Sequence, residues 1–126
     1  MKSKDLQHIG FALLRIVPSA MMLFVHGIGK FQKLIAGDFA FADPIGIGQA
    51  PSLFLAVIGE VVAPILIIVG FKTRFAAIPA FITMFVAAFV QHGADPFTKK
   101  ELAILYAVIF LVIGLIGPGK YSLDRK

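Results

Sequence analysis

The chain has 126 residues, of which 59% are hydrophobic and 15% are charged, and its mean hydropathy is +0.92. Soluble domains carry about 25% charged residues, so this composition excludes that class and favours an integral membrane protein. The chain has no cysteine, which excludes disulfides, thiolate-bound iron–sulfur clusters and a dithiol relay within it. A net charge of +5 would suggest nucleic acid in a soluble protein, but here the basic residues follow the ends of apolar segments. We therefore expect no nucleic-acid partner.

Four apolar segments follow one another along the chain, at about 6–29, 52–70, 75–91 and 101–117. A helix of about 20 residues crosses the ~30 Å hydrocarbon core of a bilayer, so each segment is close to the length of one span. The sequence predicts an all-α fold, a single membrane domain over 1–126 in which four helices form a bundle. The longer connection, about 30–51, is rich in Phe and Gly, and we expect it to lie on the membrane surface.

The basic residues predict the orientation of the bundle. Seven of them fall at the N-terminus, in the second connection and at the C-terminus: Lys2, Lys4, Lys72, Arg74, Lys120, Arg125 and Lys126. Four fall on the opposite face: Lys30, Lys33, Lys99 and Lys100. Because cytoplasmic loops carry the excess of Lys and Arg, both termini are predicted to be cytoplasmic.

Two charged residues, Arg15 and Glu60, lie inside the first and second apolar segments at similar predicted depth. An unpaired charge at mid-membrane costs from ~3 to more than 10 kcal/mol, so we predict that the two form a buried ion pair. Such a pair either fixes the register of two helices or, because Glu60 carries a proton-binding carboxylate in a low dielectric, belongs to a proton-coupled or quinone-facing site.

A second polar group is predicted at the outer ends of the helices, and it consists of His26, Lys30, Gln91, His92 and Glu101. Because three segments end on this face, their polar ends are expected to form a pocket at headgroup level for a lipid-soluble molecule with a polar head. His26 and His92 are the leading candidates for ligand contact or proton transfer. The His and Glu residues come from separate segments without a metal-binding spacing, so no metal site is predicted. The alternative is that these are ordinary polar residues at the membrane interface.

Several motifs carry a family resemblance. They are Arg15, His26-Gly27-Ile28-Gly29-Lys30-Phe31, Gly59-Glu60, Gly70-Phe71-Lys72-Thr73-Arg74-Phe75-Ala76-Ala77 and Gly117-Pro118-Gly119-Lys120-Tyr121-Ser122-Leu123-Asp124. This pattern resembles the DoxX family over nearly the whole chain. The resemblance implies a small four-helix protein of the bacterial inner membrane. Relatives named DoxD are subunits of a thiosulfate:quinone oxidoreductase, so it also implies quinone-linked redox chemistry.

Together these observations predict a quinone- or lipid-binding subunit of a membrane redox system. The chain would be at most one subunit of a quinone-linked oxidoreductase, with no cofactor of its own and with a quinone as its ligand. Its expected partners are the lipid bilayer and either a second protein subunit or another copy of itself. The alternatives are a non-enzymatic membrane scaffold that recruits partners and a small transporter, which would need a continuous polar path through the bundle.

Overall fold

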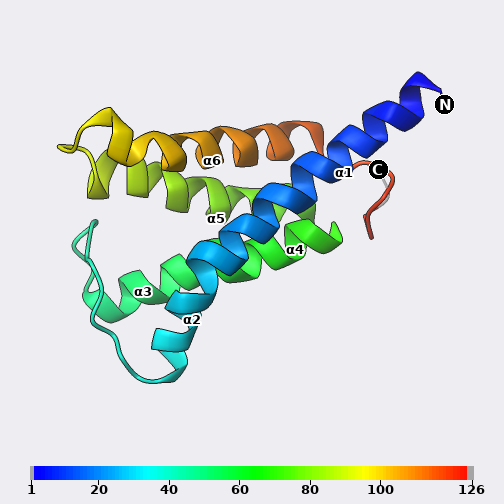
Figure 1. Cartoon of the computed structure of the whole chain (residues 1–126). Coiled ribbons are helices and arrows are strands. Elements are labelled where there is room, and N and C mark those ends of the chain that lie inside the picture. Colours follow the sequence, from blue (N-terminus) through cyan, green and yellow to red (C-terminus); the bar gives the residue numbers. More distant parts are fainter. Residues whose placement is uncertain (1, 125–126) are drawn as a thin grey trace.

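The protein is built from four long helical rods, as the computed structural model shows for the described residues 2–124 (Figure 1). The first rod joins α1 (Ser3–Met21), the π-helical segment η1 (Met22–Gly27) and α2 (Ile28–Ile35). The second joins α3 (Gln49–Val57), η2 (Ile58–Val62) and α4 (Ala63–Val69). The third joins α5 (Thr73–Val86) and η3 (Ala87–Gln91), and the fourth is α6 (Phe97–Ile116). The described chain contains no strand, which confirms the all-α prediction.

Three of the rods, Ser3–Ile35, Gln49–Val69 and Thr73–Gln91, are long and apolar enough to cross a membrane. Large apolar side chains cover their outer surface, for example Phe24, Val25 and Phe75, which are all strongly exposed. Such a surface is stable only when hydrocarbon covers it, so this is a multi-pass membrane protein. The helix α6 carries Lys99, Lys100 and Glu101 near its start, so its uncharged part, 102–116, is about 22 Å long. A fourth full span remains a prediction.

The first rod is longer than the sequence predicted. The first apolar segment was predicted to end at about residue 29, but the helix continues to Ile35, and the irregular connection covers only 36–48 rather than 30–51. A helix that ended at membrane depth would leave backbone N–H and C=O groups without partners, which favours continuation. Lys30 therefore lies within a helix, α2, and not in the irregular connection.

Small side chains allow the rods to pack closely. Ala76, Ala77 and Ala80 on α5 are buried in the main apolar cluster, beside Ile67 of α4 and Phe110 of α6. Without a hydrophobic force between helices in lipid, close van der Waals contact of this kind supplies much of the association energy. The packing of α5 against α6 is the most extensive in the bundle.

Arg15 is buried, as predicted, but the predicted ion pair with Glu60 is wrong. Arg15 instead donates hydrogen bonds to backbone carbonyls, from Nε to Ile67 O at 2.8 Å, from Nη1 to Pro118 O at 2.6 Å, and from Nη2 to Tyr121 O at 2.7 Å and Ile68 O at 3.3 Å. The last carbonyls of a helix have no partner within that helix, and here the guanidinium donates to two of those of α4, Ile67 O and Ile68 O. Glu60 precedes Ile67 by seven residues, so it lies about 10 Å along the helix axis from the carbonyl that Arg15 binds.

Both ends of the described chain meet at one end of the bundle, beside the turn between α4 and α5 (Figure 1). Lys120 Nζ lies 2.8 Å from Asp5 Oδ1, and the Asp124 carboxylate accepts hydrogen bonds from the Lys72 and Thr73 N–H groups. The basic residues that predicted orientation therefore gather at this end, except for Arg125 and Lys126, which lie outside the described residues. Which aqueous side this end faces stays a prediction.

Candidate functional site

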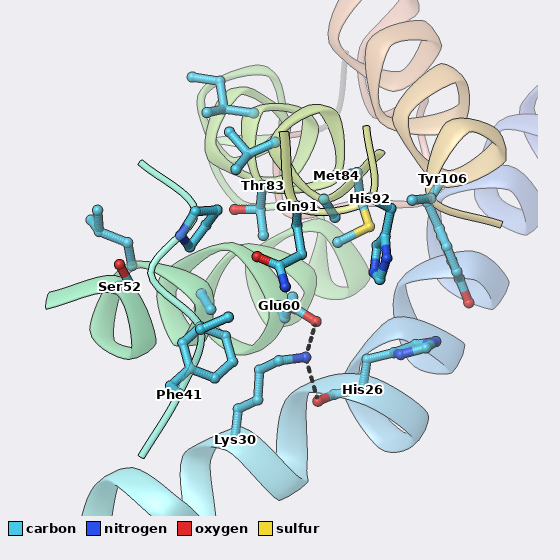
Figure 2. A pocket seen from close by; sticks show the side chains of 18 of the residues that line it. His26, Lys30, Phe41, Ser52, Glu60, Thr83, Met84, Gln91, His92 and Tyr106 are labelled. Carbon is cyan, nitrogen blue, oxygen red and sulfur yellow. Dashed lines mark hydrogen bonds and ion pairs between the residues drawn. The ribbon is translucent and has the colours of Figure 1, made fainter. Parts of the chain in front are cut away.

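A cavity of about 460 Å³ opens at the other end of the bundle, between the 36–48 connection and the rods (Figure 2). Its polar lining residues come from seven helical elements and from the turn that follows η3. They are His26, Lys30, Ser52, Glu60, Thr83, Gln91, His92, Lys99 and Tyr106. The remaining wall is mostly apolar, and Phe41, Pro44 and Ile45 of the 36–48 connection cover part of it. This combination, an apolar chamber with a few convergent polar groups, is typical of small-molecule sites.

Three π-helical segments border the cavity, and each contributes a polar lining residue. His26 belongs to η1, Glu60 to η2 and Gln91 to η3. In a π-helix the N–H bonds to the carbonyl five residues earlier, as His92 N does to Ala87 O at 3.0 Å at the end of η3. The extra residue in the turn changes the direction of the side chains that follow, and such turns occur frequently at functional sites. No pattern in the sequence predicted these π-helical segments.

A close ion pair forms one wall of the cavity. Lys30 Nζ lies 2.8 Å from Glu60 Oε1, and it also lies 3.5 Å from the carbonyl oxygen of His26 (Figure 2). The side chains of Lys30 and Glu60 are 25% and 6% exposed, so the carboxylate is almost withdrawn from solvent while the lysine side chain stays partly exposed. Lys30 thus provides the charge compensation that the sequence analysis had assigned to Arg15.

Several polar atoms on this wall have no hydrogen-bond partner within residues 2–124. They include Glu60 Oε2, the Tyr106 hydroxyl, both ring nitrogens of His26 and the side-chain amide of Gln91. Tyr106 is only 4% exposed, and its ring meets the His26 ring edge to face with centroids 6.0 Å apart. His26 is partly buried and Gln91 is exposed, so this set extends from the buried wall to the mouth of the cavity. Polar atoms that border a cavity without a protein partner are available to bind a polar ligand there.

His92 stands at the end of η3, where the chain turns toward α6. Its Nδ1 lies 2.7 Å from Asp95 Oδ2, and both side chains are about two-fifths exposed, at 41% and 42%. The ring of His92 projects into the chamber in Figure 2, near Met84 and Tyr106. His92 therefore borders the cavity and the aqueous edge of the protein at once.

Four of the five predicted ligand residues, His26, Lys30, Gln91 and His92, line one cavity. The fifth, Glu101, is exposed and is not among the lining residues. Sequence reasoning missed Tyr106, which stands in an apolar run as an ordinary aromatic residue would. Within residues 2–124, no three His, Cys, Asp or Glu side chains are grouped so that they could hold a metal ion.

A known protein family matches this chain over most of the bundle. The model of the DoxX family matches residues 10–93, which is two-thirds of the chain. The chain belongs to the DoxX family. The matched part contains His26, Lys30, Glu60, Gln91 and His92, whereas Tyr106 and the C-terminal segment that binds Arg15 lie beyond it.

Two bacterial relatives extend the match over most of this DoxX protein. A Haemophilus influenzae protein, named only "Uncharacterized protein", is 36% identical, and the match covers 91% of this chain and 88% of that one. A Bacillus subtilis protein named "Putative oxidoreductase CatD" is 28% identical, with 92% and 85% covered. No solved structure matches the chain.

Proposed function

We propose that this DoxX protein is the quinone-binding membrane subunit of a redox system, and that the quinone head group binds in the cavity beside Lys30 and Glu60. The observation that carries the proposal is the set of polar atoms on this wall without a hydrogen-bond partner within residues 2–124, chiefly Glu60 Oε2 and the Tyr106 hydroxyl, which belong to buried residues that line the cavity. A volume of about 460 Å³ accommodates one substituted aromatic ring, within the common range of ligand sites.

The wall suits both redox forms of a quinone. The oxidised form presents two carbonyl oxygens, which accept hydrogen bonds from Lys30, the Tyr106 hydroxyl or a histidine N–H. The reduced form presents two hydroxyl groups, which donate to the Glu60 carboxylate or to an unprotonated ring nitrogen. Because donors and acceptors stand side by side, the site can hold the ligand before and after it gains two electrons and two protons.

The electrons are supplied by a partner protein under this proposal, since the chain has no cysteine to hold an iron–sulfur cluster. The name of the Bacillus subtilis relative, "Putative oxidoreductase CatD", supports a redox role. The cavity opens beside the exposed apolar surface of the rods, so a ligand dissolved in the bilayer has a short path to it. The protein itself would then contribute binding, orientation and proton exchange.

Quinone binding is the first experiment. Protein purified in mild detergent is analysed by lipid extraction and native mass spectrometry, and then titrated with a short-chain ubiquinone by calorimetry. We expect retained quinone in the wild type and a loss of affinity of about tenfold in His26→Ala and in His92→Ala, corresponding to ~1.4 kcal/mol for one lost hydrogen bond to the ligand. Glu101→Gln, which changes a residue outside the cavity, is the matched control and should bind as the wild type does.

A negative result would favour the alternative role. If neither the purified nor the supplemented wild type binds quinone, the unpaired wall atoms have another ligand or none, and the membrane scaffold becomes the better function. An equal loss in Glu101→Gln would also contradict binding in the cavity, because that side chain does not line it.

We also propose that the protein resides in the bacterial inner membrane with both termini in the cytoplasm. The end that gathers Lys2, Lys4, Lys72, Arg74 and Lys120 supports this orientation, because cytoplasmic segments carry the excess of basic residues. The chain has no native cysteine, so single replacements can be labelled without background. In intact cells, Thr98→Cys should react with an impermeant maleimide and Ser3→Cys should not; the reverse pattern would invert the topology.

A further inference from the structure

The geometry points to His92 and Asp95 as a proton relay between the aqueous edge and a quinone bound in the cavity, in which His92 transfers the proton and Asp95 orients it. This inference rests on the proposed function. It adds a route for protons and a positioning residue, Asp95, that does not line the cavity.

The turn after η3 holds the two side chains together. Asp95 N donates to the His92 carbonyl at 3.0 Å, and this closes a four-residue turn that brings the carboxylate back to the imidazole. A Cβ at Gly93 would lie 2.6 Å from the Phe89 carbonyl oxygen, so the turn requires glycine there. Lys100 Nζ also donates to the Gly93 carbonyl at 3.1 Å, which ties the turn to α6. The 2.7 Å contact between His92 and Asp95 is therefore part of a constrained loop.

The contact determines which ring nitrogen serves the ligand. A carboxylate accepts hydrogen bonds, so Asp95 Oδ2 favours the tautomer in which Nδ1 carries the proton. The opposite nitrogen, Nε2, has no partner within the described part of the chain, and His92 lines the cavity. Nε2 is consequently the atom that exchanges a proton with the ligand. The Asp95 carboxylate orients the ring and stabilises the imidazolium, as in other carboxylate–histidine pairs that carry protons.

The partner protein supplies two electrons, and one oxygen of the reduced quinone takes a proton from the imidazolium form of His92. The Nε2–H bond breaks and an O–H bond forms, so the products are the hydroquinone monoanion and the neutral Nδ1–H form of His92. A hydronium ion at the aqueous edge then returns a proton to Nε2 and becomes water. The second proton that completes the quinol is transferred in the same way. The reverse sequence releases protons when the quinol is oxidised. In both directions the proton crosses between the cavity and the face of the protein that carries the η3–α6 turn.

Three features together distinguish His92 from the other titratable groups that face the cavity, which are His26, Lys30, Glu60, Lys99 and Tyr106. Glu60 and Tyr106 are buried, and Lys30 Nζ is occupied by Glu60. His26 has no carboxylate partner that would fix its tautomer among the described residues. Lys99 is exposed, but no ion pair with a carboxylate orients it within residues 2–124. Only His92, among these residues, combines cavity contact, about two-fifths exposure and an orienting carboxylate.

The experiment measures tautomer, binding and rate in the same samples. Full-length protein in nanodiscs, labelled with nitrogen-15 at histidine, is compared with Asp95→Asn, with Asp95→Glu, and with Asp38→Asn as the matched control. Asp38 also pairs with a basic residue, Lys33, in an exposed position on a different segment. The reduction of bound short-chain ubiquinone is followed by protein-film voltammetry from pH 5 to pH 9, together with its solvent deuterium isotope effect.

We expect the wild type to carry the proton on Nδ1 of His92, and Asp95→Asn to move it toward Nε2. The proton-limited rate should fall about 10- to 100-fold in Asp95→Asn, with quinone affinity changed by less than about threefold, because general acid–base transfer rather than binding is lost. Asp95→Glu, which restores a carboxylate, should recover most of the rate. Asp38→Asn should match the wild type.

Two outcomes distinguish a failure of the proton relay from a failure of the proposed quinone binding. If the wild type binds no quinone, the proposed function fails and the relay fails with it. If quinone binds normally but Asp95→Asn keeps the wild-type tautomer and rate, or if Asp38→Asn slows the reaction equally, the relay is overturned and the binding site stands.

Discussion

Lys30 Nζ and Glu60 Oε1 lie 2.8 Å apart, and this contact joins the first helical rod to the second at the wall of the cavity. Lys30 extends from α2, one turn after His26, and Glu60 occupies the π-helical segment η2. A Cβ at Gly27 would collide with the Glu60 carbonyl oxygen, so the two backbones also touch here. The ion pair therefore forms where two helices are in closest contact.

The partner of Glu60 can be established by mutant cycles. Removing one member of a buried ion pair leaves an uncompensated charge; because Lys30 is one-quarter exposed, we expect Glu60→Met to lower the free energy of unfolding by about 1–3 kcal/mol rather than the full cost of a sealed pair. Lys30→Met with Glu60→Met should recover much of this loss. Arg15→Met with Glu60→Met should be additive, since the two share no partner. Unfolding by SDS in mixed micelles measures each term, and additivity in the Lys30 cycle would contradict the pair.

Arg15 should stabilise the C-terminal segment. Arg15→Met leaves the carbonyls of Ile67, Pro118 and Tyr121 without their shared donor, and we expect a loss of about 2–5 kcal/mol because the hydrogen bonds are charge-assisted and buried. Arg15→Lys should restore little, since one ammonium group cannot reach carbonyls that surround a planar guanidinium. Amide exchange that increases at Leu123, whose N–H donates to Val69 O, would report release of the segment. Unchanged exchange there would contradict this role.

The sequence predicted the helical rods well because the bilayer imposes their length. The predicted spans 52–70 and 75–91 match Gln49–Val69 and Thr73–Gln91 within a few residues. The partners of the buried charged residues were harder to predict. A buried Arg15 reveals that it needs a partner, but backbone carbonyls of a folded-back segment leave no mark in the sequence, whereas a carboxylate such as Glu60 does. Arg15 does have buried partners, as predicted, but they are backbone carbonyls and not the Glu60 carboxylate.

The candidate site was also predicted only in part. His26, Gln91 and His92 could be grouped because each lies near the end of an apolar segment of the sequence, and these ends were predicted to share one face. Glu60 was noticed as a charge but was placed at mid-membrane rather than at the cavity wall. The π-helical turns that direct these side chains depend on packing between rods, and sequence periodicity does not resolve a single extra residue in a turn. Tyr106 has no polar neighbour in sequence that would have singled it out.

Two glycines in the first rod should respond oppositely to substitution. Gly27→Ala would place a Cβ against the carbonyl group of Glu60 and the Val61 side chain, and because backbone cannot move aside cheaply we expect a loss of about 1–3 kcal/mol. Gly29→Ala has nothing within 4 Å of the new Cβ, and it should be neutral or gain up to about 1 kcal/mol from helix propensity. Thermal unfolding in one detergent compares them. Equal effects would show that the first and second rods are farther apart than described.

Asp43 should anchor the connection that covers the cavity, and its effect should depend on pH. Its carboxylate accepts hydrogen bonds from Gly48 N at 2.8 Å, Ile47 N at 2.9 Å and Ser52 Oγ at 3.0 Å. The Gly48 N–H group, foremost, lowers the pKa of Asp43 below its ordinary value, against a smaller opposing effect of desolvation. A lowered folded-state pKa means that the anchoring is complete above the ordinary Asp value of about 3.9 and is lost as the pH falls through the folded value. Asp43→Ala should therefore increase exchange at the Ile47 and Gly48 amides at pH 6.

Asp38 is a control for Asp43, because the pKa of Asp38 is lowered foremost by an ion pair and not by backbone N–H groups. The Lys33 ammonium group, 3.0 Å from Asp38 Oδ2, is the main cause that lowers the pKa of Asp38, and both side chains are exposed. Salt screens exposed charges that are farther apart than the Debye length, which falls from about 8 Å at physiological ionic strength to about 3 Å at 1 M, whereas hydrogen bonds from backbone N–H groups depend little on salt. In a carbon-13 titration of the carboxyl groups, 1 M salt should raise the Asp38 midpoint toward its ordinary value and leave the Asp43 midpoint low. If both midpoints rise together, Asp43 is held by the general positive potential of the protein and not by the turn.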